Sequence, residues 1–164
     1  MLRRVDTLCL VAIALIGMLL PSASATSEAS NRTLKGITAV NVLVEKLPSG
    51  AQVLGVTEEA IRTDVELKLR LAGMRVVTES ESSDQPGSPF IYVLLEVTDS
   101  ARAAHIELKL EQNARLERNN EFCVADTWHT STLASNPTAQ GIRNAIKDVA
   151  DEFLNDWLSV NPKK

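Results

Sequence analysis

The stretch that decides the fold runs from residue 104 to residue 133, AHIELKLEQNARLERNNEFCVADTWHTSTL. Apolar and polar residues alternate from Ile106 to Glu111, as they do in a strand with one buried face. Asn119-Asn120 is a turn signal, because asparagine tolerates left-handed backbone dihedrals. A second β-rich run follows from Phe122 to Leu133. The stretch therefore predicts a long antiparallel hairpin.

The length of the turn sets which side chains of this hairpin share a face. With a two-residue loop at Asn119-Asn120, Leu110 lies opposite His129 and Glu111 lies opposite Trp128. The face covered by helices then carries Ile106, Leu108, Leu110, Ala125 and Cys123. The other face carries His105, Lys109, Glu111, Phe122, Val124 and Trp128. A loop one residue longer would reverse the second strand and bury Trp128.

The two-residue loop is the register that we favour. It leaves an apolar patch on the open face, and such a patch marks a contact surface. The predicted contact surface consists of Phe122, Val124, Trp128, Lys109 and Glu111. Trp128 keeps two interpretations, because a tryptophan in a strand is either a core aromatic or part of a binding surface.

Two amphipathic helices are expected beside the hairpin. The first begins at Thr57, an N-cap residue followed by acidic residues, and ends at Gly73. Its apolar stripe comprises Ile61, Val65, Leu69 and Ala72. The second begins at Pro137-Thr138 and ends at Asn161-Pro162. Its apolar stripe comprises Ile142, Ile146, Val149, Phe153 and Trp157.

Three further strands complete the predicted sheet. They cover residues 37–47, residues 74–78 and residues 90–95, and a polar surface loop is expected over residues 79–89. Phe90 to Leu95 is continuously apolar, which is typical of a central strand. The order is therefore β-α-β-β-β-β-α. We predict an α+β two-layer sandwich, with a mixed or antiparallel sheet of about five strands and both helices on one face.

The first 25 residues have the pattern of a secretory signal peptide. A cationic start at Arg3-Arg4 precedes an apolar run from Leu8 to Leu20, and small residues follow up to Ala25. Cleavage is predicted between Ala25 and Thr26. The alternative is an uncleaved anchor, but an apolar run of about 13 residues is short against the roughly 20 that a spanning helix needs.

The same segment predicts where the chain resides. Lipid attachment needs a cysteine at the cleavage point, and Cys9 lies inside the apolar run. We therefore expect an exported protein, periplasmic or secreted, that is not a lipoprotein. Cleavage would leave a flexible lead-in over residues 26–34 and one globular α+β domain over residues 35–164.

Charge excludes some classes of partner. Removal of Arg3, Arg4 and Asp6 with the signal changes the net charge from −4 to −5, and no basic cluster remains. Such a chain is a poor ligand for nucleic acid or an anionic membrane. We expect no nucleic-acid partner and no transmembrane segment in the mature chain.

The remaining residues offer little chemistry. Cys123 is alone once Cys9 is removed, so it is either a buried small hydrophobe or an intermolecular thiol. In the favoured register His105 and His129 point to opposite faces and cannot share a metal. Simple alternation also points Asp126 and His129 oppositely, which blocks a triad with Ser131.

No phosphate-binding or dinucleotide-binding motif is present in the sequence. We therefore predict no catalytic, cofactor-binding or metal-binding residues and no cofactor. A run of acidic residues in the last helix is expected on a solvated face, comprising Asp148, Asp151, Glu152 and Asp156.

A resemblance accompanies these residues. The exported N-terminus, the helix from Thr57-Glu58-Glu59-Ala60 to Leu71-Ala72-Gly73, the hairpin and the closing Phe153-Leu154-Asn155-Asp156-Trp157-Leu158 resemble small exported bacterial proteins. The element order is similar to that of periplasmic α/β sandwiches such as the lipopolysaccharide-assembly lipoprotein and the N-terminal domain of the Tol translocation protein. The resemblance covers most of the mature chain as element order alone. The missing lipid-attachment cysteine departs from the lipoprotein group, and no functional motif transfers.

Three functions are compatible with the sequence. The first is a non-enzymatic periplasmic binding or envelope-assembly module that uses an open sheet face or edge to hold another envelope protein or a hydrophobic ligand. The second is a secreted enzyme of an unrecognised type with a site near His129. The third is a structural subunit that dimerises through Cys123. We favour the first and expect no enzymatic activity.

Overall fold

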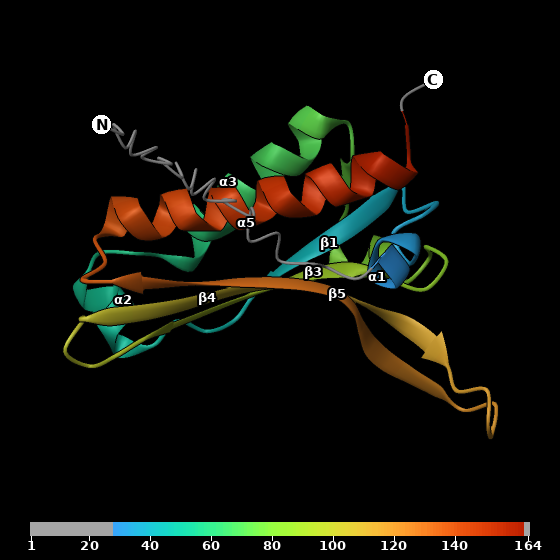
Figure 1. Cartoon of the computed structure of the whole chain (residues 1–164), viewed down its shortest axis with the longest axis horizontal. Helices are drawn as coiled ribbons and strands as arrows, with labels where there is room; N and C mark the ends of the chain where they lie inside the picture. The colour runs from blue at the N-terminus through green and yellow to red at the C-terminus, as the bar shows by residue number, and fades with distance from the viewer. Residues whose placement is uncertain (1–27, 163–164) are drawn as a thin grey trace, which may run out of the picture.

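The computed structural model describes residues 28–162 and contains one mixed sheet covered on one face by helices (Figure 1). The predicted signal peptide and its cleavage site between Ala25 and Thr26 lie outside the described residues. The elements in chain order are α1 (Glu28–Arg32), β1 (Ala39–Val44), α2 (Ser49–Val53), α3 (Glu58–Ala72), β2 (Arg75–Val76), α4 (Glu79–Ser82), β3 (Phe90–Val97), β4 (Ala103–Arg115), β5 (Phe122–Ser135) and α5 (Ala139–Val160).

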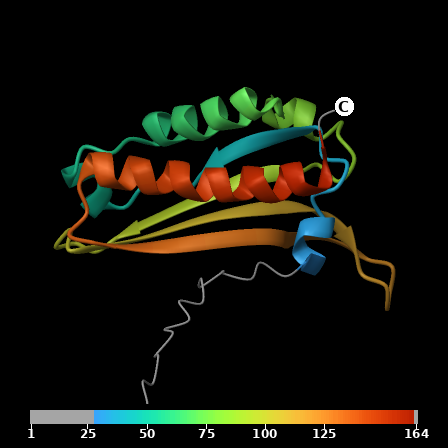
Figure 2. The ribbon, with the colours of Figure 1, turned by 45° about the horizontal axis from the view of Figure 1, so that its top comes forward.

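The sheet has five strands in the order β2-β1-β3-β4-β5. Strand β1 is parallel to both β2 and β3, whereas β3, β4 and β5 run antiparallel in turn. Helices α3 and α5 lie side by side over the same face, as the two ribbon views agree (Figures 1 and 2). The predicted α+β sandwich with both long helices on one face is confirmed, and so is the central position of β3.

The two long helices begin and end where the sequence predicts. The side chain of Thr57 accepts a hydrogen bond from Ala60 N at 3.2 Å, and that of Thr138 accepts one from Gly141 N at 3.0 Å. Gly73 ends α3 with a φ of 93°, a left-handed conformation that glycine adopts without strain. The predicted apolar stripes of both helices face the sheet and form the core with the inward side chains of β1, β3 and β4.

Three short helices differ from the sequence prediction. Helix α1 lies within the expected flexible lead-in, and Leu34 just after it is fully buried, so hydrophobic burial fixes this segment against the core. Helix α4 lies within the expected loop and begins with a capping box between Thr78 and Glu81. Helix α2 follows Pro48 and was not predicted either. The T-x-x-E spacing at Thr78 is the sequence signal that could have revealed α4.

Strands β4 and β5 form a hairpin that is longer than the helix layer above it. Its turned end extends away from the two-layer body, as Figure 1 shows. The turn spans four residues, because Leu116 N donates to Glu121 O at 2.8 Å and Asn120 adopts a left-handed φ of 63°. The predicted two-residue loop is therefore wrong, although Asn120 does supply the expected left-handed residue.

Candidate binding surface

The register of the hairpin changes once along its length. One register covers the end near the turn, as far as the pair of Glu111 with Asp126. The next pair is Leu110 with Trp128, and the rest of the hairpin follows this second register. Thr127 is the extra residue, so the irregularity is a β-bulge in β5. A one-residue bulge reverses the alternation of the strand, because side chains alternate with a period of two.

The bulge corrects the predicted position of Trp128. Its side chain is 0% exposed, and its ring makes an edge contact with Phe153 at 5.2 Å between centroids. Its Nε1–H donates to Asp156 Oδ2 at 2.8 Å, which satisfies the one polar group of the buried indole. Trp128 therefore belongs to the core under α5 and not to the predicted contact surface.

The other predicted contact residues do share the open face of the sheet, opposite α3 and α5. Phe122 pairs with Arg115, whose guanidinium lies 4.3 Å from the centre of the phenyl ring. Val124 is 57% exposed and Phe122 is 68% exposed. Lys109 and Glu111 lie on the same face, toward the middle of β4.

Further apolar side chains extend this face across the sheet. Leu43 of β1 and Leu133 of β5 are both exposed, the latter at 79%. Between them, alternation places the half-buried side chains of Phe90, Tyr92 and Leu94 from the central strand β3 on the same face. The apolar side chains of the open face are therefore Leu43, Phe90, Tyr92, Leu94, Phe122, Val124 and Leu133, and charged side chains lie between them.

Carboxylates dominate the charges of the open face. Lys109 Nζ lies 3.2 Å from Asp126 Oδ2 and 3.5 Å from Glu107 Oε2. The hydrogen bond to Asp126 is the main cause that raises the pKa of Lys109, and the neighbouring charge of Glu107 raises it further. Burial, and next the neighbouring charge of Asp126, raises the pKa of Glu111. Lys109 thus forms ion pairs with two carboxylates, and Glu111 is a third carboxylate near the same ammonium group, which leaves the centre of this face acidic.

Two more carboxylates bind neighbours on the same face. The hydroxyl of Tyr92 donates to Glu45, and the Nδ1 of His105 lies 3.3 Å from Glu96 Oε2. His129, which pairs with Lys109, also lies on the open face. The prediction that the two histidines point to opposite faces is therefore wrong, and the bulge is the reason.

The residues weighed for catalysis do not form a relay. Asp126, His129 and Ser131 all lie on the open face, contrary to simple alternation, because the bulge separates the first from the other two. Asp126 binds Lys109, and within residues 28–162 no hydrogen bond joins it to His129 or His129 to Ser131. Thr130 points the other way and donates to Glu152 Oε2 at 2.8 Å. Across the same described part of the chain, no three potential metal ligands come together.

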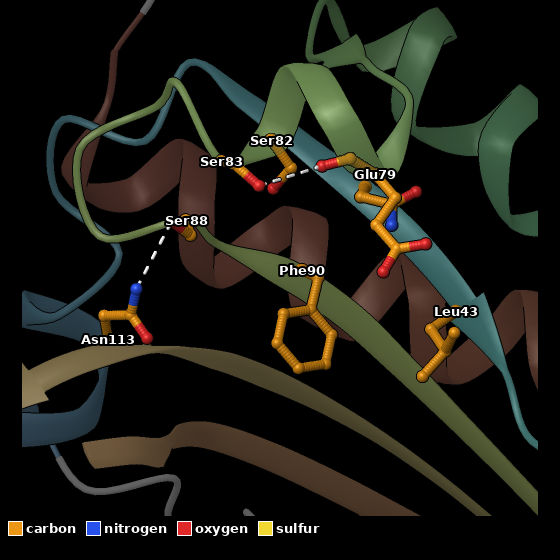
Figure 3. Close-up of a pocket in the computed structure, with 8 residues that line it drawn as sticks. Leu43, Glu79, Ser82, Ser83, Ser88, Phe90 and Asn113 are labelled. Atoms are coloured by element: carbon orange, nitrogen blue, oxygen red, sulfur yellow. Dashed lines mark hydrogen bonds between the residues drawn. The ribbon is translucent and has the colours of Figure 1, made fainter.

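A small pocket lies at one end of the open face. It measures about 220 Å³ and is lined by Asn41, Leu43, Glu79, Ser82, Ser83, Ser88, Phe90 and Asn113. Figure 3 shows the Phe90 ring and the Leu43 side chain along one side and serine hydroxyls along the other. Asn113 Nδ2 donates to Ser88 Oγ at 3.3 Å, which ties β4 to the loop before β3. The pocket is smaller than the roughly 300–1,000 Å³ typical of small-molecule sites.

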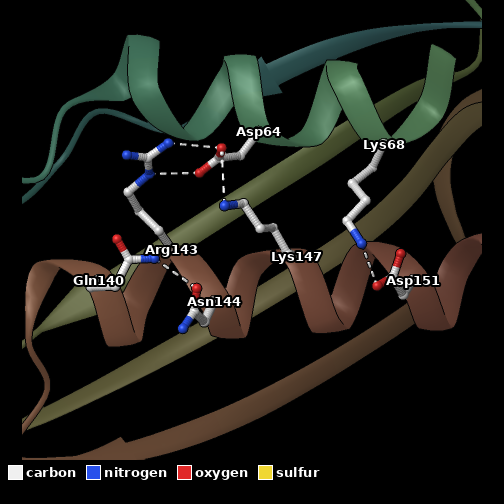
Figure 4. A network of polar contacts seen from close by, with 7 residues as sticks. All are labelled: Asp64, Lys68, Gln140, Arg143, Asn144, Lys147 and Asp151. Atoms are coloured by element: carbon white, nitrogen blue, oxygen red, sulfur yellow. Dashed lines mark hydrogen bonds and ion pairs between the residues drawn. The ribbon is translucent and has the colours of Figure 1, made fainter. Parts of the chain in front are cut away.

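Polar contacts join α3 to α5 on the other side of the sheet, as Figure 4 shows. Asp64 of α3 accepts two hydrogen bonds from Arg143 of α5, at 2.7 and 2.8 Å, and lies 3.4 Å from Lys147 Nζ. The hydrogen bonds from Arg143 are the main cause that lowers the pKa of the Asp64 carboxyl. Lys68 and Asp151 form a second bridge at 2.5 Å.

The acidic run of α5 is only partly a solvated face. Asp151 binds Lys68, Glu152 accepts from Thr130, and Asp156 accepts from Trp128. Only Asp148 of the four is plainly exposed. Sequence periodicity cannot reveal these contacts, because their partners come from α3 and β5. Cys123, for its part, is a free thiol of intermediate exposure near the hairpin turn.

No protein-family model matches the chain, and no curated protein matches it. Several solved structures have a similar arrangement. A minor lipoprotein from Acinetobacter baumannii has 10% identity and a TM-score of 0.35, over 77% of this chain and 95% of that chain. The PelC dodecamer from Paraburkholderia phytofirmans has 11% identity and a TM-score of 0.42, over 73% and 87%.

A third solved structure is a protein from Caulobacter crescentus CB15 described as a lipoprotein, with 11% identity and a TM-score of 0.30 over 82% of this chain and 98% of that chain. Two of the three neighbours are thus named as lipoproteins. They contradict the prediction that the chain is not a lipoprotein, and we correct it by withdrawing that exclusion. At such low identities and TM-scores the likeness concerns the fold, and we rest no functional argument on it.

Proposed function

We propose that this protein is a non-enzymatic binding module of the bacterial envelope that holds a partner protein on the open face of its sheet. The observation that carries the proposal is the contrast between the two faces. Helices α3 and α5 cover one face, whereas the described residues leave Val124 and Leu133 of the other exposed at 57% and 79%. An apolar surface of this kind marks an interaction site in a water-exposed protein.

The open face also specifies the chemistry of the partner. Its apolar side chains surround a cluster in which Glu107, Glu111 and Asp126 outnumber Lys109. Charge complementarity favours a partner surface that carries lysine or arginine between apolar residues. The small volume of the pocket beside Phe90 supports a protein partner over a small hydrophobic ligand.

An enzymatic role has less support. His129 and Ser131 are exposed on the open face, and Asp126 is held by Lys109, so these three described residues do not form a nucleophile with a base and an orienting acid. The export signal in residues 1–25 remains a prediction from sequence. Within residues 28–162, no helix is both long and apolar enough to cross a bilayer.

Site-specific photocrosslinking in the native cells tests the proposal. A photoreactive phenylalanine analogue replaces Val124 or Leu43 on the open face, and Leu67 serves as a matched control because it is 53% exposed on α3. We expect adducts of one common mass from the two open-face positions and none from Leu67. The crosslinked partner segment should contain lysine or arginine.

A charge reversal checks the same proposal independently. Glu111→Lys should lower the adduct yield from Val124, because the acidic centre of the face attracts the partner. The control is Glu59→Lys, which changes an exposed charge at the start of α3. Equal adducts at Leu67 and Val124, or none at all on the open face, would refute the proposal.

A further inference from the structure

The outer edge of β5 presents backbone groups without a strand to pair with. In an antiparallel ladder, alternate residues direct both N–H and C=O toward the neighbouring strand, and those between direct theirs away. Asn136 N donates to Arg102 O at 2.7 Å, so Asn136 directs its backbone groups toward β4. Ser135, which lies opposite Ala103, is the next residue and directs its groups away from β4, and the two orientations alternate from there along β5. The residues of β5 with outward N–H and C=O groups are therefore His129, Ser131, Leu133 and Ser135.

These outward groups are open to a partner. In the described part of the chain, no strand lies beyond β5 in the sheet. Helix α1 and the turn after it bind this edge at the bulge, where Ser30 Oγ and Thr33 Oγ1 donate to Thr127 O at 2.9 and 3.0 Å. The four residues with outward groups are all exposed.

The composition of this edge lacks the usual protection against pairing. Residues 128–135, Trp-His-Thr-Ser-Thr-Leu-Ala-Ser, contain no lysine, arginine, carboxylate, proline or glycine. Exposed edges are normally blunted by short length, charge or proline. The opposite edge of the same sheet follows that rule, since β2 has two residues and one of them is Arg75.

We propose that a second copy of this chain pairs with β5 in antiparallel orientation and continues the sheet across a two-fold axis. This proposal is independent of the function proposed for the open face. Each copy carries a net negative charge, but residues 128–135 contain no charged side chain that would repel its counterpart across this edge. A second copy also presents the same four outward residues, and their even spacing lets each of them pair with one in the other copy.

Only one register pairs every outward residue with another outward residue. The four positions are symmetric about Thr132, so a two-fold axis there places His129 opposite Ser135 and Ser131 opposite Leu133. This register keeps the helices of both copies on the same side of the sheet, because residues of equal parity lie opposite. It also begins beyond the bulge that α1 occupies at Thr127. Thr132 then lies opposite its counterpart as a pair without mutual hydrogen bonds, about 4.5 Å apart between Cα atoms.

Disulfide trapping tests this register in the full chain with Cys9→Ser and Cys123→Ser. A cysteine at position 132 should form an intermolecular disulfide under mild oxidation, because the expected Cα separation of about 4.5 Å lies within the disulfide range. The matched control is Leu133→Cys, whose counterpart lies diagonally, roughly 7–8 Å away. We expect crosslinked dimer for Thr132→Cys and little for Leu133→Cys; the reverse pattern, or no dimer from either, would overturn the proposal.

Sedimentation over a range of concentrations supplies a second test. Ser131→Pro removes an outward N–H and leaves the bonds to β4 intact, so the fold should persist, as circular dichroism would verify. We expect self-association about ten- to a hundredfold weaker than in the parent, since each copy loses one hydrogen bond. A parent that stays monomeric at every concentration would refute the pairing, as would an unchanged dimer in a folded Ser131→Pro variant. The cysteine pair still decides the question if the proline variant does not fold.

Discussion

The two faces of this sheet differ in what covers them, although the same strands build both. On the helix side, Trp128 is fully buried, whereas Val124, four positions earlier in the same strand and also even-numbered, is 57% exposed on the open side. Strict alternation would place both on one face, and the bulge at Thr127 separates them. One inserted residue thus assigns part of a strand to the core and the rest to the open face of the sheet.

Truncation of one side chain on each face should show the largest difference between the two faces. Trp128→Ala should lower the free energy of unfolding by about 3–5 kcal/mol, because it empties a core site and leaves Asp156 without its donor. Val124→Ala should change it by no more than about 0.5 kcal/mol. Urea unfolding followed by circular dichroism measures both values, and similar costs would contradict the assignment of the two faces.

The bridge between the helices is the next test. Asp64→Asn should cost about 1–2 kcal/mol, because the carboxylate accepts two hydrogen bonds from Arg143. The folded pKa of Asp64 lies below the unfolded one, so its contribution is present above the unfolded value of about 3.9 and is lost as pH falls through the folded pKa. Unfolding from pH 7 to pH 2 should therefore show a shallower decline for the variant; an unchanged slope would count against the bridge.

The contacts at the bulge should have a smaller effect. Ser30→Ala removes a hydrogen bond to Thr127 O and should cost about 1 kcal/mol. Because this bond helps to hold α1 against β5, together with the bond from Thr33 and the burial of Leu34, limited proteolysis near residue 30 should also become faster. Ser100→Ala, at an exposed turn, is the control. If both variants are digested at the parental rate, α1 is held by something other than this bond.

The smallest expected effect comes from Glu111 on the open face, and it has the opposite pH dependence to Asp64. Burial raises its folded pKa, so its ionised form opposes folding, and stability is gained as pH falls toward the unfolded pKa. Glu111→Gln should stabilise the protein at pH 7 by less than about 1 kcal/mol. Thermal unfolding at pH 7 and pH 4 measures the difference between variant and parent, which should shrink at pH 4. A destabilised variant at pH 7 would contradict the prediction.

Much of the fold could be predicted from local patterns. The caps at Thr57 and Thr138 and the stop at Gly73 follow from side-chain chemistry within one turn. The long helices followed from their apolar periodicity. The short helix α4 had a local signal too, the capping box at Thr78, which sequence analysis overlooked.

The candidate surface was predictable only in part. Phe122, Val124, Lys109 and Glu111 share a face as expected, and Trp128 does not. The error comes from the bulge, and no residue type in the run from Ala125 to Trp128 indicates a bulge. The partners of Thr127 O are hydroxyls of α1 and of the turn that follows it, nearly a hundred residues away in the sequence, so local patterns do not reveal them.

Local patterns in the sequence predict the two long helices and the strands, because helix caps, apolar periodicity and strand alternation act between residues that are near neighbours in the chain. The sequence by itself also determined the acidic balance of the chain. The face that each side chain of β5 occupies, and the binding of three carboxylates of α5, follow from the folded arrangement of the chain. Those outcomes depend on contacts between distant segments, where burial of the Trp128 ring and the bonds to Thr127 together select one register from several that the local pattern permits.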